Sequence, residues 1–333
     1  MSATRRAFSL CVAIACILTV AVAQARTPAP CRGTDLGRVE GLAAAESARA
    51  DDLVNADGLL WRVVKPGLAP SYLFGTIHST DDAALEVARR AADMIRGSKV
   101  VATELGGPID TVEKANIAAG MLAAALDRDH DTFEGVIPSE SRELTERLLT
   151  GQGYPAEFAH RLKPWFLAIL TALPACEAAR EALDLPEVDQ FLAQTAKDLG
   201  VKVVGLETPQ EQLESIETMR PEVAATLLTL AARKPSMNDD LYITLLRLYR
   251  ESRPAEILPV SDAIGGLSEA ERSAQDQFMR VLLVDRNAVM GERSAPLIAS
   301  GGAFIAVGAL HLAGKTGLVE RLRAEGYSVT KVW

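Results

Sequence analysis

The chain has 333 residues, of which 48% are hydrophobic and 24% charged, and it carries a net charge of −9. This composition excludes low-complexity and collagen-like chains, and the acidic balance without a basic stripe argues against nucleic acid as a partner. The length suffices for one large domain or two small ones, with a core that needs no disulfide scaffold. Histidine is scarce, since only His78, His130, His160 and His311 occur.

The first 25 residues have the pattern of a secretory signal peptide. Arg5 and Arg6 precede an apolar run over residues 7–23, and residues 23–25 (Ala-Gln-Ala) form a small-x-small cleavage site. An N-terminal membrane anchor is the alternative, but the apolar run is short for a membrane span. Residues 4–8 also match a twin-arginine export signal loosely. The sequence therefore predicts a periplasmic or secreted protein.

Cleavage at this point leaves one domain over residues 26–333, with no further apolar run that could span a membrane. It removes Cys11 and Cys16 and leaves Cys31 and Cys176. Two cysteines in an exported protein predict one disulfide, which would tie the N-terminal arm to the middle of the chain. Two free, buried thiols are the alternative.

The hydrophobic pattern after residue 59 predicts an α/β fold. Short strand-like runs at 60–64 and 71–74 predict a hairpin, and a helix capped by Asp81 or Asp82 follows and ends at Gly97. Its predicted buried face consists of Leu85, Ala88, Ala92 and Ile95. Further strands are expected at 99–104, 201–207, 304–307 and 327–332, of which the first two are expected to be buried. Helical stretches are expected at 111–181, 188–199, 210–287 and around 318–322.

From this order we predict an α/β single domain, with a mixed β-sheet built from two related strand-helix-strand halves and two long helical insertions. A split into two domains is the alternative.

Two matching segments carry the main functional signal. Residues 72–78 (YLFGTIH) and 305–311 (IAVGALH) each contain an apolar strand followed by Gly-x-x-His. Gly75 and Gly308 would let a ligand or another backbone approach closely. His78 and His311 would then stand at the carboxyl ends of strands, where open α/β sheets bind ligands.

Two glutamates occupy similar places, because Glu104 and Glu207 each close a predicted buried strand. A carboxylate there is costly unless it has a partner. Imidazole and carboxylate together suit a divalent metal such as Mn²⁺, Co²⁺, Zn²⁺ or Fe²⁺, which could activate water and polarise a carbonyl. The alternative is that each is an ordinary hydrogen-bonded polar group, or that the glutamates pair with arginines. The four residues together favour a site.

At these residues the sequence resembles the TraB/GumN family, which is related to the Tiki proteins. The resemblance spans about residues 60–333, and its paired Gly-x-x-His motifs are the specific part. It implies a metal-dependent protease in which His78, His311 and Glu104 serve the metal, with Glu207 beside them. The matching segments are residues 73–78, 103–105, 163–165, 188–189, 205–208, 286–287 and 307–311.

The interpretation of five further residues is less direct. The Arg286-Asn287 pair could orient a carboxylate or bind one from a substrate, although a surface arginine and a helix cap would look the same. Trp165 is expected to be a core anchor. His160 is expected on a helix surface, and His130 lies in a charged segment that predicts a solvated loop.

The chain lacks Gly-x-Ser-x-Gly, His-Glu-x-x-His, P-loop and dinucleotide-binding motifs. With these classes weakened, the resemblance implies an exported metal-dependent hydrolase that acts on a peptide or protein. Glu104, Glu207, Arg286 and Asn287 are its expected catalytic residues. The alternatives are a non-catalytic peptide-, haem- or metal-binding protein on the same fold, and a scaffold that acts through its helical insertions.

Overall fold

The structure is a computed structural model that describes residues 30–39, 53–127, 132–151, 153–181, 183–264 and 266–333. The predicted signal peptide and His130 lie outside these residues. Within them, no helix is long and apolar enough to cross a membrane.

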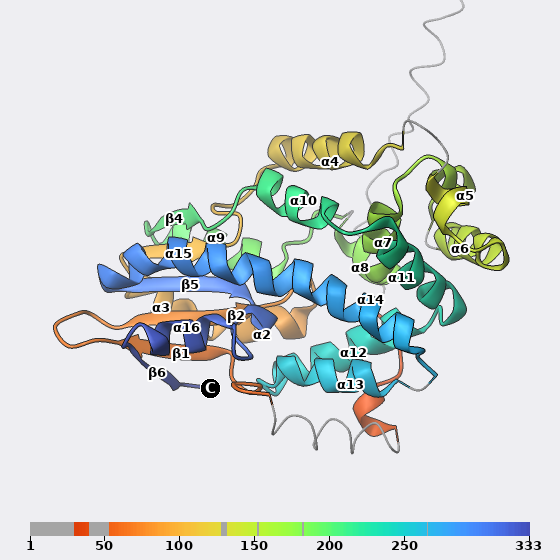
Figure 1. The fold of residues 1–333 in the computed structure, drawn as a ribbon. Helices are drawn as coiled ribbons and strands as arrows, with labels where there is room; N and C mark the ends of the chain where they lie inside the picture. Colours follow the sequence, from red (N-terminus) through yellow and green to blue (C-terminus); the bar gives the residue numbers. More distant parts are fainter. Residues whose placement is uncertain (1–29, 40–52, 128–131, 152, 182, 265) are drawn as a thin grey trace, which may run out of the picture.

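A six-stranded mixed sheet in the order β4-β3-β5-β2-β1-β6 forms the centre of the fold (Figure 1). The predicted hairpin is confirmed, because β1 and β2 pair antiparallel. β2, β5, β3 and β4 run parallel to one another, and β6 pairs antiparallel with β1 at the other edge. The strands are β1 (Leu60–Val64), β2 (Ser71–Thr76), β3 (Val100–Thr103), β4 (Lys202–Gly205), β5 (Ala303–Gly308) and β6 (Ser328–Lys331).

Helices cover both faces of the sheet and extend beyond one end of it (Figure 1). The α-helices are α2 (Asp82–Arg89), α3 (Ala92–Arg96), α4 (Thr111–Ala125), α5 (Thr132–Val136), α6 (Ser139–Gly151), α7 (Pro164–Ala172), α8 (Ala175–Glu181), α9 (Val188–Asp198), α10 (Pro209–Glu217), α11 (Pro221–Arg233), α12 (Met237–Arg250), α13 (Ile257–Ala263), α14 (Glu269–Met279), α15 (Asp285–Ala299) and α16 (Leu318–Ala324). Shorter turns are η1 (Leu36–Arg38), η2 (Ala156–His160), η3 (Pro254–Glu256), η4 (Arg280–Val284, a π-helical segment) and η5 (Ala309–His311).

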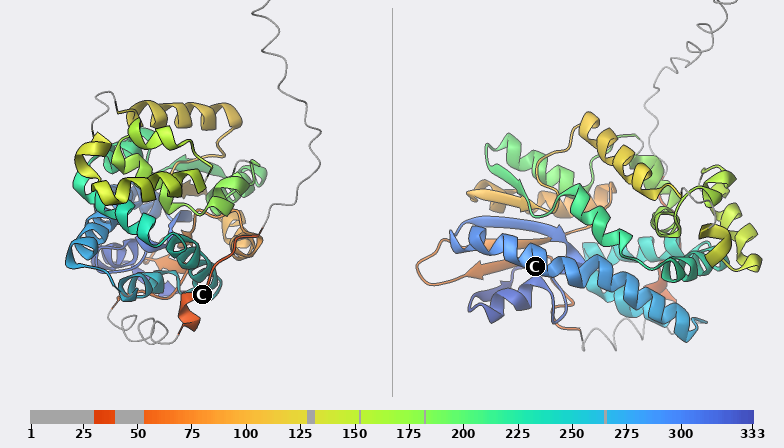
Figure 2. Two further views of the ribbon diagram at one scale, coloured as in Figure 1. Left: turned by 90° about the vertical axis from the view of Figure 1, so that its right-hand side faces the viewer. Right: turned by 45° about the horizontal axis from the view of Figure 1, so that its top comes forward.

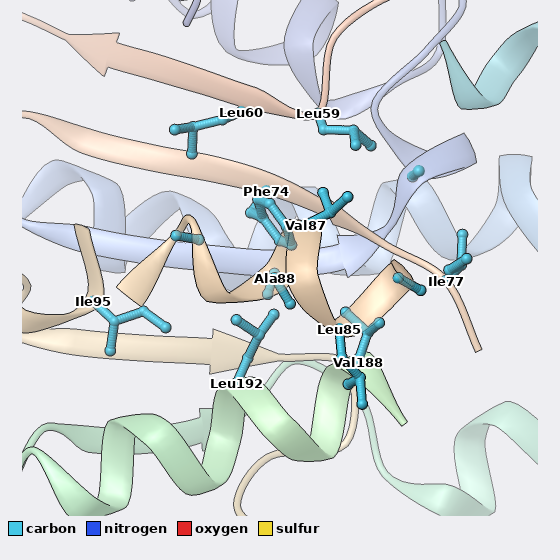
Figure 3. Close-up of a cluster of buried hydrophobic side chains, with 14 of the residues drawn as sticks. Leu59, Leu60, Phe74, Ile77, Leu85, Val87, Ala88, Ile95, Val188 and Leu192 are labelled. Carbon is cyan, nitrogen blue, oxygen red and sulfur yellow. The ribbon is translucent and has the colours of Figure 1, made fainter. Parts of the chain in front are cut away.

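The sheet is the middle of three layers. Alternation along the strands sends Phe74 to one face and Leu73 to the other. On the first face, Phe74 packs in one cluster with residues of α2, α3 and α9, as the close-up in Figure 3 shows. On the second face, Leu73 packs with Met290 of α15 and Leu322 of α16. Because β5 is buried on both sides, it is the rigid centre from which the site is built.

The two helical insertions pack against each other. Helices α5, α6 and α7 come from the first insertion, and α10, α11 and α14 come from the second, yet all contribute to one apolar cluster. Trp165 of α7 lies in it with 5% exposure, together with Leu228 of α11. Figure 2 shows these helices gathered beside the sheet. The insertions therefore form one helical layer at the end of the α/β domain.

The predicted fold class, a single α/β domain with a mixed sheet, is confirmed, but three details differ. The sheet order does not show two related halves, because β3 lies beside β5 whereas β6 lies beside β1. The helix expected before Gly97 is divided into α2 and α3. The strand expected to be buried near residues 201–207 is partly exposed, because β4 is an edge strand. Asp81 caps α2 as expected.

The predicted disulfide between Cys31 and Cys176 is confirmed. It joins the arm before η1 to α8, across 145 residues of sequence. A disulfide of this kind favours an extracytoplasmic, oxidising location.

Reduction of this disulfide is expected to lower the free energy of unfolding by about 2–4 kcal/mol, because the reduced unfolded chain gains the entropy of a long open loop. Urea unfolding with and without dithiothreitol measures the loss. The Cys31→Ala, Cys176→Ala double variant should start from the reduced value and ignore dithiothreitol. Equal stability of the oxidised and reduced forms would contradict the expectation.

Candidate active site

The strand-end residues come together because four parallel neighbouring strands end at one edge of the sheet. His78 follows β2, His311 follows β5, Glu104 follows β3 and Glu207 follows β4. The turns after β3 and β4 are joined by a hydrogen bond from the Glu207 N–H to the Glu104 carbonyl at 2.8 Å. The carboxylates of two strands therefore lie side by side.

Arg286 of α15 bridges these two carboxylates. Its Nη2 donates to Oε2 of Glu104 and to Oε2 of Glu207, both at 2.6 Å, and its Nε donates to Glu207 at 3.1 Å. Gln212 of α10 donates to the same two oxygens at 3.1 and 3.2 Å. Both glutamates are buried, and buried carboxylates require such partners. Arg286 and Gln212 thus fix the orientation of both carboxylates.

His311 is buried with its ring held from both sides. Its Nδ1 lies 2.8 Å from Oδ1 of Asn287, and its Nε2 lies 3.7 Å from Oε1 of Glu104. An amide oxygen only accepts hydrogen bonds, so the proton is on Nδ1 and Nε2 turns its lone pair toward Glu104. Asn287 therefore selects the tautomer of the ring.

The charges of the two groups follow from their surroundings. Burial lowers the pKa of His311 to about 4, against the attraction of Glu104. Burial also opposes ionisation of Glu104, but His311, Arg286 and the Gly308 N–H, which donates to Oε1 at 2.7 Å, together lower its pKa to about 2. At neutral pH the imidazole is uncharged and the carboxylate is ionised.

His78 pairs with carboxylates outside this cluster, although its charge also acts on Glu104. Its Nδ1 is 3.2 Å from Glu187 and 4.0 Å from Asp189, and 65% of its side chain is exposed. The hydrogen bond with Glu187 raises the pKa of His78 above its usual value, and Asp189 adds to the effect. His78 is therefore a cation at neutral pH. Asp189 is held in place by Thr76, whose hydroxyl donates to it at 3.0 Å.

A cavity of about 660 Å³ opens beside these residues and lies within the usual size range of small-ligand sites. His78 and Glu104 both line it, together with Asp189 and Gln212. Residues of helix α4 form part of its lining. The cavity therefore reaches Glu104, which lies 3.7 Å from the buried His311.

Two of the three predicted metal ligands have the chemistry that a divalent ion requires. The lone pair of His311 Nε2 faces an ionised oxygen of Glu104 with no donor hydrogen between them, and the other ring nitrogen is hydrogen-bonded, as in metal-ligating histidines. His78, the third, is protonated and turned to Glu187, so it has no lone pair to offer. Within the described ranges, no three His, Cys, Asp or Glu side chains are grouped as a metal site. The residues fit a divalent ion at Glu104 and His311.

The two motif glycines serve different purposes. A Cβ on Gly75 would lie 2.9 Å from Cα and Cβ of Ala309, where the chain after β5 crosses close to β2. A Cβ on Gly308 would lie 3.2 Å from Oε1 of Glu104 and 3.2 Å from Cδ2 of His311. Gly75 therefore permits the packing of two strand ends, and Gly308 leaves room for the site.

Gly75→Ala is accordingly expected to lower the free energy of unfolding by about 1–3 kcal/mol, since backbone atoms must move. Gly308→Ala should cost less stability but displace Glu104 or His311 and so impair binding or turnover at the site. Urea unfolding of both variants gives the comparison. Unchanged stability of Gly75→Ala would contradict the packing role.

The TraB/PrgY/gumN family model matches residues 59–331, which covers every strand and the whole candidate site. The chain belongs to this family. Neither a curated protein nor a solved structure matches the chain at a significant level. Membership of the TraB/PrgY/gumN family thus establishes the relationship that the paired Gly-x-x-His motifs indicated.

Sequence reasoning missed three residues of the site. Glu187 sits in the connection before α9, where the sequence shows only a helix start. Gln212 lies five residues after Glu207, and its side-chain amide could have been recognised as a hydrogen-bond donor for that carboxylate. Tyr249 of α12 donates from its hydroxyl to the Gly75 carbonyl at 2.9 Å, which no local pattern reveals. His160 lies away from the site and contacts Glu134 and Glu146.

Proposed function

We propose that this TraB/PrgY/gumN protein is an exported metal-dependent hydrolase that cleaves peptide bonds at the Glu104–His311 pair. The observation that carries the proposal is that Nε2 of the buried His311 lies 3.7 Å from the buried carboxylate of Glu104, which lines a large cavity. Such perturbed groups are more common at functional sites than elsewhere. The Cys31–Cys176 disulfide supports an oxidising compartment.

The ion would be held by Nε2 of His311 and Oε1 of Glu104, and His78 could join them if it lost its proton and left Glu187. Mn²⁺, Co²⁺ and Zn²⁺ all accept this donor set. A bound divalent ion lowers the pKa of water and polarises a carbonyl group.

The other residues act by position and charge. Arg286, Gln212 and Glu207 keep Glu104 in one orientation, and Asn287 keeps the Nε2 lone pair of His311 available. Protonated His78 stands on the same cavity and can donate a proton to a departing amine. Histidines whose pKa values are shifted in opposite directions are suited to opposite proton-transfer roles.

Digestion of a mixed peptide library by the purified protein, with Mn²⁺, Co²⁺ and Zn²⁺ added in turn, tests the proposal. We expect cleavage that depends on the metal, is lost in His311→Ala and is retained in His160→Ala. His160 is a matched control, because it also contacts carboxylates but lies outside the cavity. Cleavage that persists in His311→Ala would refute the assignment.

A second candidate is a peptide-, haem- or metal-binding protein without turnover. The observation that favours it is the engagement of His78 by Glu187, which leaves only two of the predicted ligands together. The same digestion distinguishes the two candidates, because a binding protein without turnover leaves the library peptides uncleaved with each of the three metals.

A further inference from the structure

The walls of the cavity carry an excess of negative charge. Besides Glu104, which shares Arg286 with Glu207, the carboxylates of Glu181, Glu187 and Asp189 line it. The cationic groups on the lining are His78 and Lys114. His78 already pairs with Glu187, so it does not balance the others.

Lys114 does not supply the missing charge either. Its Nζ bonds Asp184 at 2.5 Å, and Asp184 is not one of the lining residues. This ion pair fastens the first half of α4 beside the cavity. Lys114 is therefore paired with a carboxylate outside the cavity lining, and its attraction for Glu181 does not outweigh the effect of burial.

Glu181, at the end of α8, is the carboxylate without a counterpart. Its carboxylate makes no hydrogen bond or ion pair with any residue that the structure describes. Burial, together with repulsion from Glu187 and Glu177, raises the pKa of Glu181 to about 7. A half-buried carboxylate without a partner in a cavity is in the situation that a bound cation relieves.

Asp189 also lines the cavity. Its Oδ2 is buried and accepts no hydrogen bond from any described residue, although His78 lies 4.0 Å away. Part of the lining is apolar, since α4 contributes Ile117, Ala118 and Met121. A ligand that fits both the acidic and the apolar part has an aliphatic stem and a positive end, as lysine and arginine side chains do.

We propose that the cavity selects peptides with a lysine or arginine side chain, whose charged end pairs with Glu181 while its stem lies along α4. This inference rests on the proposed function for the identity of the ligand as a peptide. Glu181 is then a specificity-determining residue that takes no part in the chemistry.

Binding of three acetylated, amidated pentapeptides, Ala-Ala-X-Ala-Ala with X as lysine, norleucine or glutamate, tests this. Isothermal titration at low salt is run on the wild-type protein, on Glu181→Gln and on Glu140→Gln. Glu140 is a matched control, because it is an exposed glutamate of α6 outside the cavity. Mass spectrometry of the same samples records any cleavage.

We expect the lysine peptide to bind the wild type roughly tenfold more tightly than the norleucine peptide, and the glutamate peptide to bind most weakly, as one charge-assisted contact predicts. The preference should fall several-fold in Glu181→Gln and remain in Glu140→Gln. Equal binding of the three peptides, an undiminished preference in Glu181→Gln, or no binding at all would overturn the inference.

The two proposals fail in different ways. Charge-selective binding without cleavage would refute the proposed hydrolase activity and support the proposed peptide selectivity. Cleavage without charge preference would support the proposed hydrolase activity and refute the proposed peptide selectivity.

Discussion

An Arg286→Leu variant is expected to lose about 3–5 kcal/mol of unfolding free energy, because it leaves Glu104 and Glu207 buried without their shared counter-charge. Gln212 remains as a donor to both carboxylates, but a neutral amide cannot offset two negative charges. Urea unfolding at neutral pH measures the loss. Adding Glu207→Gln to this variant should restore part of the stability, since one of the unpaired charges is removed.

Arg293→Leu is the matched control for this experiment. Arg293 also lies on α15 and also pairs with a glutamate, Glu211, but both side chains are about 40% exposed. Exposed pairs of this kind contribute about 0–1 kcal/mol. If the two arginine variants lost equal stability, the buried cluster would not be the strongly coupled unit described above.

The second large effect is expected on activity. Glu104→Gln keeps the shape of the side chain and can still accept from the Gly308 N–H, so the fold should be retained. It removes the negative charge that faces His311 Nε2 and lies at the proposed reaction site. We expect peptide cleavage to fall at least about 100-fold, the range typical for loss of one catalytic group. Rates of cleavage and far-ultraviolet circular dichroism of the variant provide the two readouts.

Glu211→Gln controls for the loss of a paired glutamate near the site. It belongs to the same helix as Gln212, but its partner Arg293 is on the surface and it does not line the cavity. Its cleavage rate should match that of the wild type. A Glu104→Gln variant with more than half of the wild-type rate would exclude Glu104 from the chemistry.

The sequence predicts that Glu104 and Glu207 lie near each other. A buried apolar strand that ends in a carboxylate indicates where the carboxylate lies and that it requires a hydrogen-bonding or charged partner. Parallel strands bring such ends to one edge of the sheet. The Arg286-Asn287 pair drew attention through the family resemblance, and its contacts with Glu104 and His311 appear only in three dimensions.

The contacts of the His78 side chain could not be predicted from the sequence. A Gly-x-x-His pattern places a histidine just beyond a strand, but it does not fix the direction in which the side chain turns. Here Glu187, which lies 109 residues further along the chain, is the hydrogen-bond partner of His78 Nδ1. Likewise, the apolar run at β4 could not distinguish an edge strand from a central one, because both bury at least one face.

Metal content of the purified protein tests the pairing of Glu104 with His311 as a metal site most directly. Elemental analysis after equilibration with Zn²⁺, Mn²⁺ or Co²⁺ and gel filtration should find bound metal in the wild type and in His160→Ala. It should find little in His311→Ala or Glu104→Gln. Metal bound equally by all four proteins would contradict the assignment of these two residues as ligands.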